Sequence, residues 1–237
     1  MTSDAVTLLK TQVSFLDKIL RNYAYRCALI EIWEQHSNNP EEWSKIPEDL
    51  KRPYAALENS LYDQICNKLW ILFDSSDKRI SKEKRNWDIH FHRLLDYPQI
   101  LSSSEKLKHL AELPGEMQVK ELKKLLLALE NINEKEFDKA MRDIKIYRKK
   151  EISHKELYTI EQSSNPETQR FYPVLLSPIK AAFSLLKTLS ATRSSVLEEN
   201  SCKNYIMSSL LPYEYNFNDY INHHKKNFKL SMDFFLN

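Results

Sequence analysis

The chain has 237 residues, a hydrophobic fraction of 42% and a formal net charge of +2. Its single glycine, Gly115, excludes glycine-rich phosphate loops, dinucleotide fingerprints and nucleophile elbows, because each of these needs glycine at fixed positions. Hairpin-rich β folds are disfavoured as well, since their turns need residues with positive φ. Composition therefore predicts an all-α protein, and the near balance of charge means that any basic surface is local.

Cysteine usage and the apolar segments predict a cytoplasmic protein. Cys27, Cys66 and Cys202 are odd in number and widely spaced, which favours reduced thiols over a disulfide framework. The first twenty residues carry Asp and Lys within their apolar pattern, so we expect no signal peptide. No apolar run approaches the ~20 residues that a transmembrane helix needs, and we expect no membrane contact.

Apolar residues recurring at spacings of three and four predict two long helices in the first third of the chain, over 5–36 and 53–73. The apolar face of the second is expected at Leu57, Leu61, Ile65, Leu69 and Leu72. A shorter helix is expected around 87–95, stopped by Pro98. Another is expected within 102–113, with serines in N-cap register.

Helices are next predicted over 116–131 and 134–152. The inner face of the second carries Phe137, Met141 and Ile144, and Arg148 lies eleven residues after Phe137. At ~100° per residue, Arg148 returns to within ~20° of the direction of Phe137. We therefore expect Arg148 to lie along the apolar face, where it needs a partner. Lys145 and Lys149 are expected to point away from that face.

The segment after Arg148 predicts the start of a further helix. Ser153 and Glu156 form the S-x-x-E pattern of a capping box, which places His154 in the first helical turn. The positive end of that helix would attract a phosphate. After a loop, a helix beginning at Ser177 and Pro178 and an aromatic-rich last helix are expected to pack on the bundle.

These residues resemble a known motif. The HEPN superfamily of small helical bundles carries an arginine followed by a histidine four to six residues later, often as RNKxxAH, and "RKKEISH" at 148–154 is similar to it. The flanking segments, "LWILFDSSD" at 69–77 and "YRKKEISHKEL" at 147–157, resemble the abortive-infection (AbiU-like) branch. The resemblance covers about residues 5–160. It implies one HEPN-like domain over 1–237 with long antiparallel helices, on which 175–237 packs.

The resemblance implies a metal-independent endoribonuclease, a toxin or antiphage effector that cleaves RNA by attack of its 2′-OH. His154 would transfer the proton and Arg148 would stabilise the phosphorane, without metal or cofactor. Lys149, Lys150 and Lys155 would bind the RNA backbone. One histidine serves one end of the reaction, so the family's homodimer with two facing motifs is expected, and an antitoxin or defence-system protein is a further partner.

Two alternatives stay open. In active HEPN proteins the residue after the arginine is usually Asn, Asp or His, whereas here it is Lys149, which favours a non-catalytic HEPN-type module that binds RNA, a nucleotide or a protein. The segment "RNWDIHFH" at 85–92 also matches the arginine-to-histidine spacing, at His90 and His92. No long helix leads into this segment, so we interpret both histidines as ordinary side chains of a surface helix. Metal-ligand patterns such as H-E-x-x-H are not found.

Overall fold

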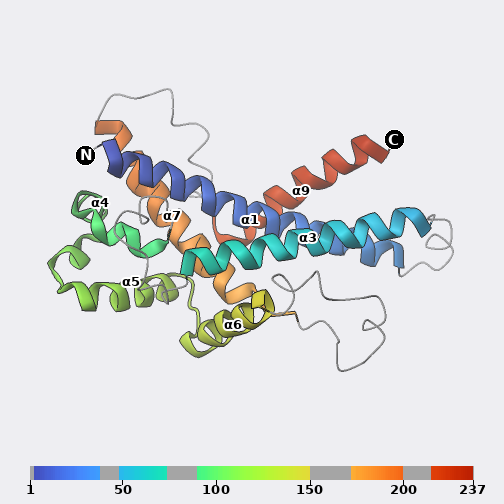
Figure 1. Ribbon diagram of the computed structural model, residues 1–237. Helices are drawn as coiled ribbons and strands as arrows, with labels where there is room; N and C mark the ends of the chain where they lie inside the picture. Colours follow the sequence, from blue (N-terminus) through green and yellow to red (C-terminus); the bar gives the residue numbers. More distant parts are fainter. Residues whose placement is uncertain (1–2, 38–47, 74–89, 150–171, 200–214, 237) are drawn as a thin grey trace.

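The computed structural model describes residues 3–37, 48–73, 90–149, 172–199 and 215–236 (Figure 1). Every regular element within these ranges is helical, which confirms the all-α prediction. The elements in chain order are α1 (Ser3–Ser37), α3 (Glu48–Phe73), η2 (Phe91–Asp96), α4 (Pro98–Ser102), η3 (Lys108–Glu112), α5 (Gly115–Leu129), α6 (Glu134–Tyr147), α7 (Leu176–Glu199) and α9 (Phe217–Leu236).

The two longest helices, α1 and α3, lie side by side and run antiparallel (Figure 1). Asn22 of α1 donates to Gln64 of α3, and Arg26 of α1 pairs with Glu58 of α3 at 2.6 Å. The later residue of α1 thus contacts the earlier residue of α3, as in an antiparallel pair. Helices α7 and α9 pack on α1. One apolar cluster draws buried side chains from all of these helices and from η2, α4, α5 and α6.

The apolar face of α3 differs from the expectation at one position. The four later residues of the stripe, Leu61 to Leu72, are buried, whereas Leu57 is 42% exposed. Leu57 was wrongly assigned to the inner face. Helix α3 begins at Glu48, before the predicted start, and includes Pro53.

The region between α3 and α5 is folded into shorter pieces than predicted. A helix was expected around 87–95, but its described part forms the 3₁₀ helix η2. Pro98 was expected to stop that helix and instead begins α4. Proline suits this position because the first helical residue needs no amide hydrogen. The serine-led helix expected within 102–113 is reduced to η3.

The break between α5 and α6 is where the two asparagines predicted it. Asn131 adopts a left-handed conformation with φ of 52°, which asparagine tolerates better than most residues. The Asn133 side chain accepts hydrogen bonds from the amides of Lys135 and Glu136, and so caps α6. On α6, Phe137 and Ile144 are buried as predicted.

The C-terminal helices also follow the pattern of the sequence. Helix α7 buries Ile179, Phe183 and Leu186 in the core. Helix α9 is joined to α1 by polar contacts, from Tyr220 to Asp17 and from Lys225 to Glu31. This packing agrees with the expectation that the last helix covers the bundle.

Candidate functional site

Arg148 directly follows the last residue of α6 and is half-buried, as its helical phase predicted. Its Nε–H donates a hydrogen bond to Asn67 Oδ1 at 2.7 Å, and its Cζ lies 5.4 Å from the centroid of the Trp70 ring. Both partners come from α3. An amide oxygen and an indole face thus both contribute to orienting the arginine.

The sequence did not reveal Asn67 or Trp70 as site residues. They lie three residues apart, on the same side of α3. A polar side chain beside the otherwise apolar stripe of α3 was the available signal. It could not be assigned to Arg148 without knowing that α6 packs against α3.

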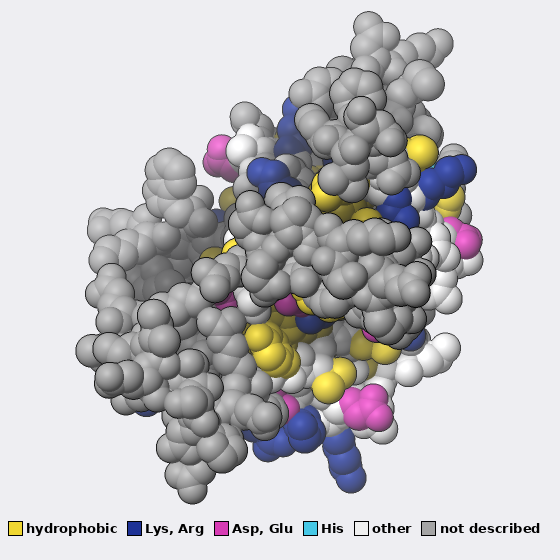
Figure 2. Space-filling view, turned by 90° about the vertical axis from the view of Figure 1, so that its right-hand side faces the viewer, with side chains coloured by type: hydrophobic (Ala, Val, Ile, Leu, Met, Phe, Trp, Pro, Cys, Tyr) yellow, Lys and Arg dark blue, Asp and Glu magenta, His cyan; other side chains and the backbone are white. Residues whose placement is uncertain are grey.

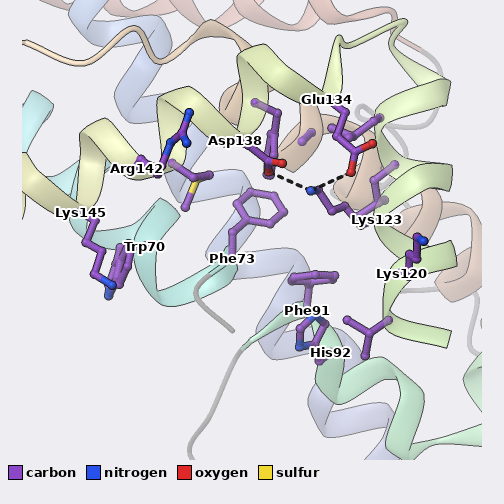
Figure 3. A pocket seen from close by; sticks show the side chains of 16 residues that line it. Trp70, Phe73, Phe91, His92, Lys120, Lys123, Glu134, Asp138, Arg142 and Lys145 are labelled. Atoms are coloured by element: carbon purple, nitrogen blue, oxygen red, sulfur yellow. Dashed lines mark hydrogen bonds and ion pairs between the residues drawn. The ribbon is translucent and has the colours of Figure 1, made fainter. Parts of the chain in front are cut away.

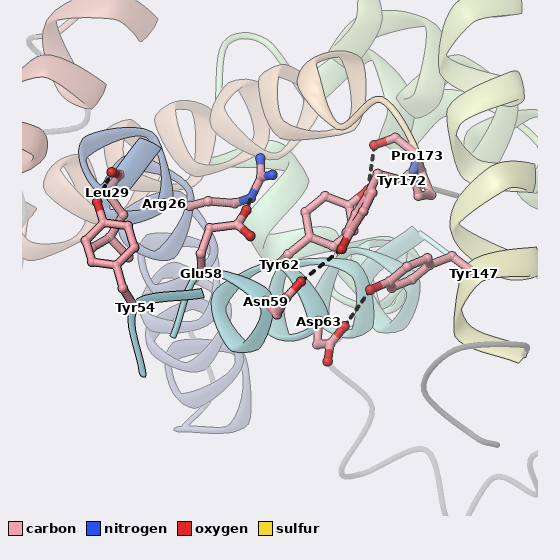
Figure 4. Close-up of polar contacts among 10 residues, drawn as sticks. All are labelled: Arg26, Leu29, Tyr54, Glu58, Asn59, Tyr62, Asp63, Tyr147, Tyr172 and Pro173. Carbon is pink, nitrogen blue, oxygen red and sulfur yellow. Dashed lines mark hydrogen bonds and ion pairs between the residues drawn. The ribbon is translucent and has the colours of Figure 1, made fainter. Parts of the chain in front are cut away.

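The residue before Arg148 anchors this junction (Figure 4). Tyr147 is 2% exposed, its hydroxyl donates to Asp63 Oδ1 at 2.7 Å, and its ring meets that of Tyr62 edge-on at 5.3 Å. The Tyr62 hydroxyl in turn donates to the carbonyl of Pro173 at 2.6 Å. Burial raises the pKa of Tyr147, and Asp63 adds to the effect, so the phenol remains a donor. The end of α6 is therefore fixed to α3 and to the segment leading into α7.

Of the other predicted site residues, the structure describes only Lys149. Lys149 is exposed, in agreement with the expectation that it points away from the apolar face. Lys150, Ser153, His154 and Lys155 lie outside the described residues. The structure therefore brings Arg148 together with Asn67 and Trp70, while its relation to His154 stays a prediction.

The competing histidines are not exposed side chains of a surface helix, which corrects the interpretation made from the sequence: His92 lies on the 3₁₀ helix η2 and is half-buried. His90 is only 7% exposed, and its Nδ1 accepts a hydrogen bond from the amide of His92 at the start of η2. Burial, with the neighbouring His90, lowers the pKa of His92 to about 3. His92 is therefore unprotonated near neutral pH and a poor general acid.

A pocket of about 610 Å³ opens between α3, η2, α5 and α6 (Figure 3). The rings of Phe73 and Phe91 lie at its centre, 5.5 Å apart. Trp70 also lines it, so the pocket and Arg148 share one indole. Its volume falls within the ~300–1,000 Å³ of sites that bind small ligands.

Four basic and two acidic side chains also line this pocket. Lys123 pairs with Glu134 at 3.0 Å and with Asp138 at 2.8 Å. The remaining basic residues are Lys120, Arg142 and Lys145. On the face shown in Figure 2, Lys and Arg side chains lie at several separate places, with Asp and Glu side chains among them.

The described residues contain no group of three or more His, Cys, Asp or Glu side chains placed to bind one metal ion. None of the helices in the described part of the chain combines the length and apolarity needed to cross a bilayer. Cys27 and Cys66 are free thiols, and Cys202 lies outside the described ranges. Comparison of the chain with protein-family models, curated proteins and solved structures gives no match.

Proposed function

We propose that this chain is a metal-independent endoribonuclease of HEPN type, acting in the cytoplasm as a toxin or antiphage effector. The observation that supports the proposal most is the placement of Arg148. A half-buried guanidinium held by Asn67 and Trp70 is an oriented cation, whereas Lys145 and Lys149 on either side of it in the chain are exposed. An oriented guanidinium suits the recognition of two phosphate oxygens by its planar fork.

The proposed reaction is transesterification within the RNA. The 2′-oxygen forms a bond to phosphorus while the bond from phosphorus to the 5′-oxygen breaks. His154 takes the proton of the 2′-OH, and His154 of a second copy gives a proton to the leaving 5′-oxygen. Arg148 stabilises the charge on the phosphorane, and Lys149, Lys150 and Lys155 attract the backbone. The products are a 2′,3′-cyclic phosphate and a 5′-hydroxyl.

Incubation of the purified protein with RNA in EDTA tests this proposal. We expect cleavage with the stated ends, and a loss of roughly 10²–10⁴-fold for His154→Ala. Arg148→Ala should also be inactive, and Arg148→Lys should be poor because a point charge does not reproduce the bidentate fork. The matched control is His109→Ala, since His109 is exposed on η3. Equal activity of the His154→Ala variant and the wild type would refute the assignment of the site.

The proposed site needs two copies of the motif, so we expect a symmetric dimer with the 144–157 segments near its axis. Static light scattering at micromolar concentration should give twice the mass of the chain. A monomer with full activity would contradict the two-copy site.

The second candidate is a non-catalytic module that binds RNA or a nucleotide through the same face. Two observations favour it. The residue after the arginine is Lys149, and the pocket beside Trp70 combines aromatic and basic side chains. RNA that is bound but stays intact in the cleavage assay would favour this function over the nuclease.

A further inference from the structure

The proposed cleavage chemistry gives no role to the pocket between α3, η2, α5 and α6, and Arg148 is not among the described residues that line it. Its central wall is aromatic and apolar. Phe91 and Phe137 are almost fully buried and support Phe73, which contacts both rings. The half-buried rings of Phe73 and Trp70 are the ones with surface left for a ligand. A flat apolar group is the natural occupant of such a wall, because aromatic faces stack on one another.

The basic side chains around this wall are available to an anion. Lys120, Arg142 and Lys145 form no ion pair with any other described residue, whereas Lys123 is neutralised by its two carboxylates. In Figure 3, Arg142 and Lys145 lie on one side of the central rings and Lys120 lies on the other. The pocket therefore offers positive charge at two separate places, with an aromatic surface between them.

Trp70 connects the pocket to Arg148. Lys145 Nζ lies 5.5 Å from the centroid of its ring, and Arg148 Cζ lies 5.4 Å from it. A phosphate beside Lys145 would be close to the indole that also orients Arg148. A single ligand would therefore place one group in the pocket and the adjacent group at Arg148.

We infer that this pocket takes one unpaired nucleotide of a single-stranded RNA, with its base against the aromatic wall and its two flanking phosphates at the separate basic places. The RNA assignment rests on the proposed function, whereas affinity for a nucleotide as such does not. An internal nucleotide carries phosphate on both sides of its sugar, which matches the two basic places. A base must be unpaired to enter, so duplex RNA is excluded.

Binding to the full-length His154→Ala variant tests the inference, because this substitution is designed to leave RNA uncleaved. The probes are a fluorescein-labelled single-stranded RNA, its duplex, adenosine 5′-monophosphate and ribose 5-phosphate. We expect the single strand to bind best and to compete with adenosine monophosphate. Ribose 5-phosphate should bind about tenfold more weakly than the nucleotide, since it lacks the stacking base. Equal binding of ribose phosphate and nucleotide would overturn the aromatic site.

Charge substitutions made in the His154→Ala variant distinguish the contribution of Arg142 and Lys145 from that of Lys120. Arg142→Gln should weaken both adenosine monophosphate and RNA by about fivefold. Lys120→Gln should weaken RNA but not the mononucleotide, which has only one phosphate. Glu134→Gln should strengthen both, since it removes a competing carboxylate. Lys226→Gln on α9 is the control, because Lys226 is exposed and on a helix that does not line the pocket.

The outcomes separate this inference from the proposed function. Unchanged affinities for Arg142→Gln and Glu134→Gln would overturn the pocket as the site, whether or not the wild type cleaves RNA. Adenosine monophosphate binding that single-stranded RNA does not displace would overturn the RNA assignment. The expected variant pattern together with an inactive wild type would support the pocket and refute the nuclease.

Discussion

The contact between Arg148 and Asn67 yields the sharpest prediction. Asn67→Ala removes the oxygen that accepts the Nε–H bond at 2.7 Å. A buried hydrogen bond to a charged group contributes about 1.5–3 kcal/mol, and half-burial reduces this to about 1 kcal/mol. Alanine in a helix is more favourable than asparagine by about 0.6 kcal/mol, which offsets part of the loss. The net change in the free energy of unfolding should therefore be below about 1 kcal/mol.

The effect of the same substitution on RNA cleavage should be larger than its effect on stability. Without Asn67 the guanidinium loses the acceptor of its Nε–H, and a loss of about 1.4 kcal/mol in transition-state stabilisation lowers kcat/KM about tenfold. Urea unfolding measures the first quantity, and cleavage of a labelled RNA in EDTA measures the second.

Asn67→Asp is the matched control, because it keeps an acceptor at the same place. Stability should not fall, since the carboxylate holds the guanidinium more strongly than the amide does. Cleavage should still fall, because the new charge competes with the phosphate for Arg148. A folded Asn67→Ala protein with activity within about twofold of the wild type would refute the view that Asn67 positions Arg148.

The remaining predictions concern the stability of the frame that holds the site. Asn133→Ala removes the cap of α6 and should lower the free energy of unfolding in urea by about 1 kcal/mol. Asn131→Ala should cost about 1 kcal/mol because of its φ of 52°, whereas Asn131→Gly should not, and calorimetry would show the difference in Tm. Burial lowers the pKa of His224 to about 4, so between about pH 6.5 and 4 the unfolded chain binds more protons than the folded one. Stability is therefore lost as pH falls through this window, and His224→Phe should reduce that loss by about 1 kcal/mol in urea titrations at pH 7 and 5.

The sequence by itself determined the helical class and the position of the longer helices. The apolar spacing along α1, α3 and α7 and the paired asparagines before α6 are local signals, and local signals specify local structure. The phase of Arg148 was also determined locally, because helical geometry fixes its direction relative to Phe137. Shorter elements such as η2 and η3 were misjudged, since a few residues carry too little periodicity to identify a 3₁₀ turn.

Only the tertiary structure decided which residues meet. Asn67 and Arg148 are 81 positions apart in the chain, and no spacing rule connects them. The burial of His90 likewise depends on its neighbours in space, since Gln12 of α1 donates to its carbonyl from 78 positions away. The pocket is assembled from α3, η2, α5 and α6. The chain encodes each amphipathic face separately, and packing those faces on one core brings distant polar side chains together.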